Sequence, residues 1–161
     1  DKRCLELVTG QRVAYIGDEE AVPDINLVFA SNPTELVNQI LYTRAVKTTY
    51  ELSLIRKASV IGARGHLAAK EGFEQNLSEF EIHIKFLEAT GLNEHALPYG
   101  NIVAQNDHAS LLHYQHQERH VPDPILSLLI DAGGSYKGYA SDITRTYCTR
   151  NKYEVFETGV F

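Results

Sequence analysis

Two aspartates eleven residues apart, Asp131 and Asp142, have the clearest capacity for chemistry in this 161-residue sequence. They bracket a segment with glycines at 133, 134 and 138, which is typical of a β-hairpin. If the turn centres between Tyr136 and Lys137, the two carboxylates lie directly opposite each other on one face, with Cβ atoms roughly 4.5–5.5 Å apart. Like charges so placed repel, but a hard divalent cation between them makes the arrangement favourable. The spacing therefore predicts part of a metal site.

The register of the hairpin decides whether this prediction holds. A slip of one residue, for example through a bulge at Gly138, would turn Asp142 to the other face of the sheet. On spacing alone, both aspartates could equally be turn residues that face water. The neighbours of Asp142 favour the first interpretation, because Ile143 and Thr144 are typical of a strand interior, where Asp is uncommon.

The elements that must position this hairpin follow an α+β order. Capping boxes at Thr48–Glu51 and Ser78–Glu81 predict a long helix through Gly72 and a second helix to about Ala89. Apolar residues at 52, 54, 55, 60, 61, 68 and 69 would form the buried face of the long helix. Strands are expected at 101–105, around 111–114, and in the hairpin arms 125–130 and 143–147.

The first part of the sequence predicts a separate unit. Residues 12–17 are typical of a short strand with a glycine stop, followed by an acidic loop. A helix is expected over 34–42, with apolar residues at 36, 37, 40 and 41 on one buried face.

Four segments in order resemble one known family: residues 98–103 (PYGNIV), 112–114 (LHY), 129–133 (LIDAG) and 138–147 (GYASDITRTY). They are similar to the Xaa-Pro dipeptidase (prolidase) branch of the pita-bread metallopeptidases, and in particular to the bacterial prolidases that include the organophosphorus acid anhydrolases. The resemblance extends strongly from about Tyr42 to Tyr147 and weakly over the first forty residues.

This resemblance implies a role for each matching residue. Asp131 and Asp142 would be two of the five ligands of a pair of divalent metal ions, with Mn²⁺ as the expected metal. His113 matches a catalytic histidine that does not bind the metals directly, and Tyr99 matches a tyrosine that lines the substrate pocket. Thr144, two residues beyond Asp142, would support the site by hydrogen bonding.

The resemblance also implies that this chain is a truncated fragment. One His and two Glu ligands of the family would lie beyond Phe161, so we expect the fragment itself to be inactive. Its absence of methionine and the apolar run 153–161 favour the same interpretation. Residues 1–44 would be the C-terminal remnant of an N-terminal α/β domain, and 45–161 the first half of a pita-bread (creatinase/aminopeptidase-like) catalytic domain, with two helices on a curved antiparallel sheet.

Composition narrows the partners and the compartment. A net charge of −6 argues against nucleic-acid binding, and no apolar run is long enough to predict a membrane span. Cys4 and Cys148 stand far apart in sequence, which favours a reducing compartment, so we expect a cytoplasmic protein. A half domain would expose apolar surface, which predicts aggregation, domain exchange or dimerisation. The resemblance implies that the parent protein binds an Xaa-Pro dipeptide, and we expect that protein to be a homodimer.

Three other interpretations stay open. His113, His116 and His120 have spacings of three and four that could array imidazoles along a helix for zinc, although a solvated loop is the simpler expectation. An Xaa-Pro aminopeptidase acting on longer chains is the nearest alternative enzyme. A pita-bread protein that binds peptides or proteins without catalysis is the third, although the two retained aspartates argue against it.

Overall fold

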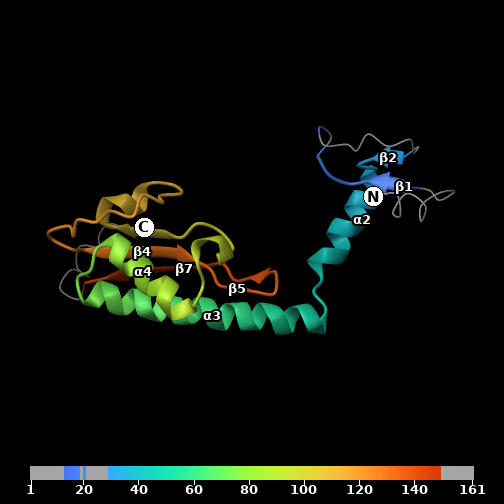
Figure 1. Cartoon of the computed structure of the whole chain (residues 1–161). Coiled ribbons are helices and arrows are strands. Elements are labelled where there is room, and N and C mark those ends of the chain that lie inside the picture. Colours follow the sequence, from blue (N-terminus) through green and yellow to red (C-terminus); the bar gives the residue numbers. More distant parts are fainter. Residues whose placement is uncertain (1–12, 19, 21–28, 150–161) are drawn as a thin grey trace. The chain divides into compact units, whose positions relative to one another are not determined.

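The computed structural model describes residues 13–18, 20 and 29–149. The chain divides into two compact units, residues 1–48 and 49–161, which are described separately below (Figure 1). None of the helices in the described ranges combines the length and apolar character needed to cross a membrane. The apolar run 153–161 and the residue Cys4 lie outside the described residues.

Among its described residues, the first unit contains a parallel strand pair and one α-helix. Strand β1 (Val13–Tyr15) pairs with β2 (Phe29–Ser31), which confirms the strand predicted at 12–17, although residue 12 itself lies outside the described ranges. Helix α2 (Thr34–Ala45) confirms the predicted helix and extends it by three residues.

The predicted buried face of α2 is wrong. No residue of this helix is buried, and Leu41 is 56% exposed. Among the described residues of this unit, the two strands have three residues each, which is too few to cover the apolar side of α2.

Two helices dominate the second unit, and their ends follow the sequence closely. Helix α3 (Thr49–Glu74) begins directly after Thr48 and runs two residues beyond its predicted end. Helix α4 (Glu79–Thr90) has the predicted capping box, in which the Ser78 hydroxyl accepts from the Glu81 backbone N–H and the Glu81 carboxylate accepts from the Ser78 backbone N–H. Gly91 ends α4 with a φ of 68°, a left-handed conformation that glycine adopts without strain.

The buried face of α3 differs from the apolar pattern that predicted it. Leu54 and Ala69 are buried as expected, but Leu52 and Val60 are exposed, and small residues at 58, 62, 65 and 72 form half of the buried face. Gly65 shows the cause, because a Cβ atom there would lie 2.4 Å from the Phe86 ring of α4. Close helix packing, rather than large apolar side chains, defines this surface.

A three-stranded antiparallel sheet packs against the helices, in the order β3-β4-β7. Its strands are β3 (Ile102–Gln105), β4 (Ser127–Ala132) and β7 (Ile143–Cys148). The short strands β5 (Ser135–Tyr136) and β6 (Tyr139–Ala140) continue the hairpin beyond β4 and β7. The three strands predicted at 101–105, 125–130 and 143–147 are therefore confirmed, with small shifts at their ends.

The strand predicted around 111–114 is wrong. A 3₁₀ turn, η3 (Asn106–Ser110), follows β3, and residues 111–126 form an irregular loop. Another short 3₁₀ turn, η2 (Glu94–Ala96), precedes β3. His113 has a φ of 55°, which is incompatible with an extended strand.

The core lies between the two helices and one face of the sheet, and α3 and α4 lie on the same side of β4 and β7 (Figure 1). Apolar side chains from both layers meet there: Ala69, Phe73, Ile82, Phe86, Val103, Leu128, Ile130 and Ala132. In β4 these core residues alternate with Leu129 and Asp131, whose side chains therefore belong to the opposite face. The predicted arrangement of two helices on one face of an antiparallel sheet is confirmed.

Candidate metal and substrate site

The hairpin brings Asp131 and Asp142 to the sheet face that the helices do not cover. Asp131 lies directly opposite Thr144, and the turn centres between Lys137 and Gly138. The predicted direct pairing of the two aspartates is wrong by two positions, because Lys137 and Gly138, both with positive φ, form the tip. A shift of two residues conserves the face, so Asp142 becomes the diagonal neighbour of Asp131.

A single hydroxyl group joins the two carboxylates. The Tyr99 hydroxyl lies 2.8 Å from Oδ1 of Asp131 and 2.9 Å from Oδ1 of Asp142, so both oxygens are directed at one point. Burial raises the pKa of Tyr99 well above its ordinary value, and the hydrogen bonds to the two aspartates raise it further. The phenol therefore stays protonated and serves as a donor that the two anions share.

The hollow beside Asp131 also contains the predicted catalytic histidine. His113 and Thr144 line it together with Asp131, and its volume is about 250 Å³. The rest of its wall comes from Ile102, Ala109, Ser110, Leu111, Leu112 and Leu129. Asp131 is common to both groups, because it accepts from Tyr99 together with Asp142 and lines the hollow together with His113. The roles of these four residues stay predictions. The hydrogen bonding expected of Thr144 also stays a prediction.

The root of the hairpin is fixed by contacts with α3 that the sequence did not reveal. The Ser141 hydroxyl accepts from the Gly134 N–H at 2.9 Å and lies 3.2 Å from the Ala58 carbonyl oxygen, to which it can donate. A Cβ atom on Gly134 would lie 2.6 Å from both that oxygen and the Gly62 nitrogen. The sequence does contain both glycines, Gly134 in the hairpin and Gly62 in the helix. It could not show that they contact each other, because that contact depends on the tertiary fold.

His66 supports β4 from the helix side. Its Nε2 atom lies 3.0 Å from the carbonyl oxygen of Ala132, the residue after Asp131, and therefore donates to it. The ring is buried and stands edge-on to Phe86. Burial is the main cause that lowers the pKa of His66, so the imidazole is neutral at pH 7. Sequence patterns gave no indication of this residue.

The histidine-rich segment does not form a helix. His113, His116 and His120 lie in the irregular loop after η3, which confirms the loop expectation and makes the zinc-helix interpretation wrong. Within residues 13–18, 20 and 29–149, no group of three or more His, Cys, Asp or Glu side chains is arranged to hold a metal ion.

The donor chemistry of the aspartate pair nevertheless fits a hard divalent cation. Two carboxylate oxygens that approach one hydroxyl are oxygen ligands of the type that Mn²⁺ and Mg²⁺ take, and their mutual repulsion would be relieved by a cation. Octahedral oxygen sites need about six ligands, so Asp131 and Asp142 can supply only part of the set.

This combination of fold and paired aspartates is that of a metallopeptidase. The pattern of metallopeptidase family M24 matches residues 53–158, and the chain belongs to this family. It is 51% identical to an Xaa-Pro dipeptidase of Shewanella loihica over 137 residues, which cover 85% of this chain and 31% of that protein. An Xaa-Pro dipeptidase of Stenotrophomonas maltophilia is 46% identical over 143 residues, covering 89% of this chain and 32% of the relative.

A solved structure shows the same fold. Proline aminopeptidase P II from Yersinia pestis matches with a TM-score of 0.62 and 28% identity, over 74% of this chain and 27% of that one. The second unit is thus the first half of a pita-bread domain, as the resemblance implied. The chain spans about a third of the length of the curated relatives it matches.

Proposed function

We propose that these 161 residues are part of a dinuclear-metal Xaa-Pro dipeptidase, called the parent protein below. Residues 1–44 would be the end of its N-terminal domain and 45–161 the first half of its catalytic domain. The observation that supports this most directly is the convergence of Asp131 and Asp142 on the Tyr99 hydroxyl, beside the hollow that His113 lines. The identity to proteins named Xaa-Pro dipeptidase supports the substrate class.

The residues of this chain would divide the work at the site. Asp131 and Asp142 would hold two divalent ions, with Mn²⁺ as the proposed metal, together with ligands from later in the parent protein. When bound, the ions would make water a nucleophile at neutral pH and polarise the peptide carbonyl before proline. His113, exposed on the rim of the hollow, would donate a hydrogen bond to the developing oxyanion or to the substrate carboxylate.

Tyr99 would have two tasks in this arrangement. Its hydroxyl would hold the two aspartates in their convergent orientation, and its ring would form part of the substrate pocket. In the absence of metal, burial and the two aspartates raise its pKa, so the hydroxyl serves as a donor that holds the pair together before the ions bind.

The rest of the proposal concerns the whole protein. The isolated 161 residues would be inactive, because they supply two of the five ligands expected for the family. The parent protein would be a cytoplasmic homodimer with no nucleic-acid or membrane partner.

The test is hydrolysis of an Xaa-Pro dipeptide such as Ala-Pro by the parent protein, with Mn²⁺ and with EDTA. We expect activity that depends on metal and is lost in Asp142→Asn. Metal-independent hydrolysis, or full activity of that variant, would contradict the proposal.

An Xaa-Pro aminopeptidase is the second candidate, and one observation favours it: the similar solved structure is named an aminopeptidase. Comparing Ala-Pro with Ala-Pro-Ala separates the two, since a dipeptidase would cleave only the shorter peptide. A non-catalytic binding protein would cleave neither peptide, and its melting temperature would not respond to Mn²⁺.

A further inference from the structure

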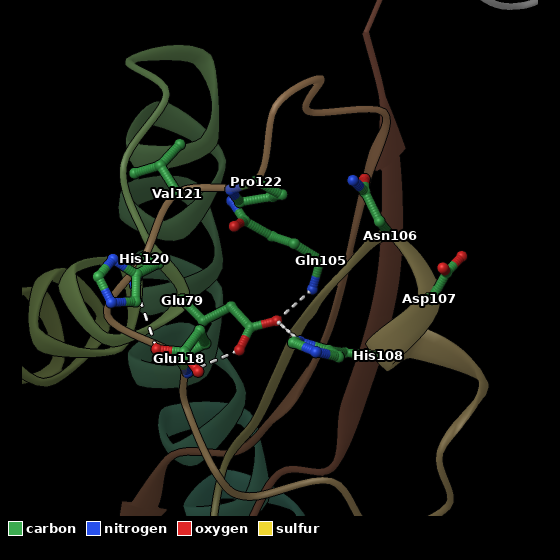
Figure 2. Close-up of a pocket in the computed structure, with 9 residues that line it drawn as sticks. All are labelled: Glu79, Gln105, Asn106, Asp107, His108, Glu118, His120, Val121 and Pro122. Atoms are coloured by element: carbon green, nitrogen blue, oxygen red, sulfur yellow. Dashed lines mark hydrogen bonds and ion pairs between the residues drawn. The ribbon is translucent and has the colours of Figure 1, made fainter.

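A buried glutamate organises the loop that contains His113. The Glu79 side chain is 1% exposed, and its two oxygens each have two hydrogen-bond donors. Figure 2 shows the bonds from Gln105, His108 and Glu118. Oε1 accepts from the Gln105 N–H at 2.7 Å and from Nδ1 of His108 at 2.8 Å. Oε2 accepts from the Tyr114 hydroxyl at 2.6 Å and from the Glu118 N–H at 2.7 Å. The carboxylate is thus fully occupied by donors from the protein itself.

The four donors are spread along the segment 105–118 that contains His113. Gln105 is the last residue of β3, His108 lies in η3, and Tyr114 and Glu118 lie in the irregular loop that follows. One carboxylate therefore holds residues 105–118 at four points. The His108 ring also stacks on Tyr114, with 4.7 Å between ring centroids. Outside this cluster, Leu112 is 88% exposed, so the loop has little apolar burial of its own there.

The loop needs such an anchor because its backbone is strained. His113 and Gln117 have φ values of 55° and 52°, a region that side chains other than glycine seldom occupy. Conformations of this kind cost about 1–3 kcal/mol each and persist only where the surroundings enforce them. Tyr114 points inward to Glu79, and the adjacent His113 lines the hollow that contains Asp131.

We propose that Glu79 is a positioning residue for His113: by holding Tyr114 and the Glu118 N–H, it fixes the loop conformation that presents the imidazole to the Asp131 side. This inference rests on the proposed function in so far as His113 acts on the substrate. Glu79 itself is not among the residues that line the hollow beside Asp131.

A separate hollow of about 370 Å³ next to Glu79 is not a competing ligand site for this carboxylate. Glu79, Gln105, His108, Glu118 and His120 line it (Figure 2). Both oxygens of Glu79 already face protein donors, which leaves no vacant direction for a ligand. Burial and the Glu79 hydrogen bond raise the pKa of Tyr114, so its hydroxyl remains a donor.

The experiment uses the parent protein with Mn²⁺ and three variants. Glu79→Gln keeps the shape of the side chain but puts an NH₂ group against N–H donors, and Tyr114→Phe removes one bond while leaving the Glu79 charge. Glu88→Gln, an exposed carboxylate on the same helix, is the matched control. Hydrogen exchange of the 106–118 backbone and the kcat and KM for Ala-Pro are measured for each.

We expect Glu79→Gln to accelerate exchange in 106–118 about tenfold or more and to lower kcat about tenfold with little change in KM, because misplacement of a catalytic group by even 1 Å is costly. In a His113→Ala background, the same substitution should lower kcat by less than about twofold, since contributions through a shared partner are not additive. Metal content should stay normal. Glu88→Gln should change neither exchange nor kcat.

Two results would overturn the inference: unchanged exchange in 106–118, or an equal loss of kcat with and without His113. If Glu79→Gln fails to fold, Tyr114→Phe decides by the same two measurements. If the wild-type parent protein cleaves no Xaa-Pro peptide, the proposed function fails, and the exchange measurement alone decides whether Glu79 holds the loop.

Discussion

Replacing Asp142 by Asn should stabilise the metal-free parent protein while destroying its response to metal. The Tyr99 oxygen lies 2.8 Å and 2.9 Å from the two carboxylate oxygens, so these oxygens lie within about 5.7 Å of each other, and about 5 Å serves for the estimate. Coulomb repulsion at that separation is about 0.8 kcal/mol in water and about 3 kcal/mol at an effective dielectric constant near 20. Asp142 is exposed, so the lower part of that range applies. We expect a gain of about 1 kcal/mol, equivalent to about 1 °C in melting temperature for a parent protein about three times as long as this chain.

The opposite effect should appear with Mn²⁺. A metal present at about 100 times its dissociation constant stabilises the native protein by about 2.7 kcal/mol, and a variant without one ligand should lose most of this gain. The assay is thermal unfolding in EDTA and in Mn²⁺, for the wild type and Asp142→Asn. Asp107→Asn, at an exposed aspartate beside the other hollow, is the matched control and should change neither melting curve.

Asp142→Asn should therefore raise the melting temperature in EDTA and reduce the stabilisation by Mn²⁺. A lower melting temperature of Asp142→Asn in EDTA would show that the pair is not repulsive. A wild-type shift with Mn²⁺ that the variant retains would show that Asp142 is not a ligand.

Three further predictions concern the surroundings of the site. His113→Ala should lower turnover of Ala-Pro by about 10²–10⁴-fold while metal content, measured by atomic absorption, stays normal; loss of metal would instead make His113 a ligand. Gly65→Ala should destabilise the fold by about 1–3 kcal/mol in urea unfolding, because its Cβ would lie 2.4 Å from the Phe86 ring. Gly72→Ala is the control, since its Cβ would lie 3.2 Å from its nearest neighbours and should change stability by less than about 1 kcal/mol; equal effects would contradict the packing argument. Because the pKa of buried His66 is lowered, the unfolded state binds more protons below pH 6.5, so stability attributable to a neutral His66 should fall as pH drops from 7 to 5. The difference in unfolding free energy between wild type and His66→Asn should therefore narrow over that range, and a constant difference would show that the pKa is not lowered.

The sequence predicted those elements whose signals are local. The capping box at Ser78 and the stop at Gly91 depend on residues within a few positions, and both were confirmed. The hairpin arms were also found from alternation and glycines. Even the face of Asp131 and Asp142 was correct, because an even shift in register conserves it.

The failures share a cause in long-range contacts. Residues 111–114 have strand-like composition, but the inward bond of Tyr114 to Glu79, 35 residues away, holds them in a loop. The buried side of α3 could not be recognised from hydrophobicity, because Gly62 and Gly65 have no side chain. Their surface is buried because Ser141 and Phe86 pack directly against the helix backbone there. Glu79 itself looked like an ordinary first-turn acidic residue of a helix.

The alternation of side chains in β4 places residues that form the core and residues that face the hollow at adjacent positions of one strand. Leu128, Ile130 and Ala132 face the helices, whereas Leu129 and Asp131 face the hollow. Substitutions at Leu128, Ile130 and Ala132 would alter folding, and under the proposed function those at Leu129 and Asp131 would alter chemistry. Laboratory evolution could then vary substrate preference at these two positions while leaving the hydrophobic interior untouched.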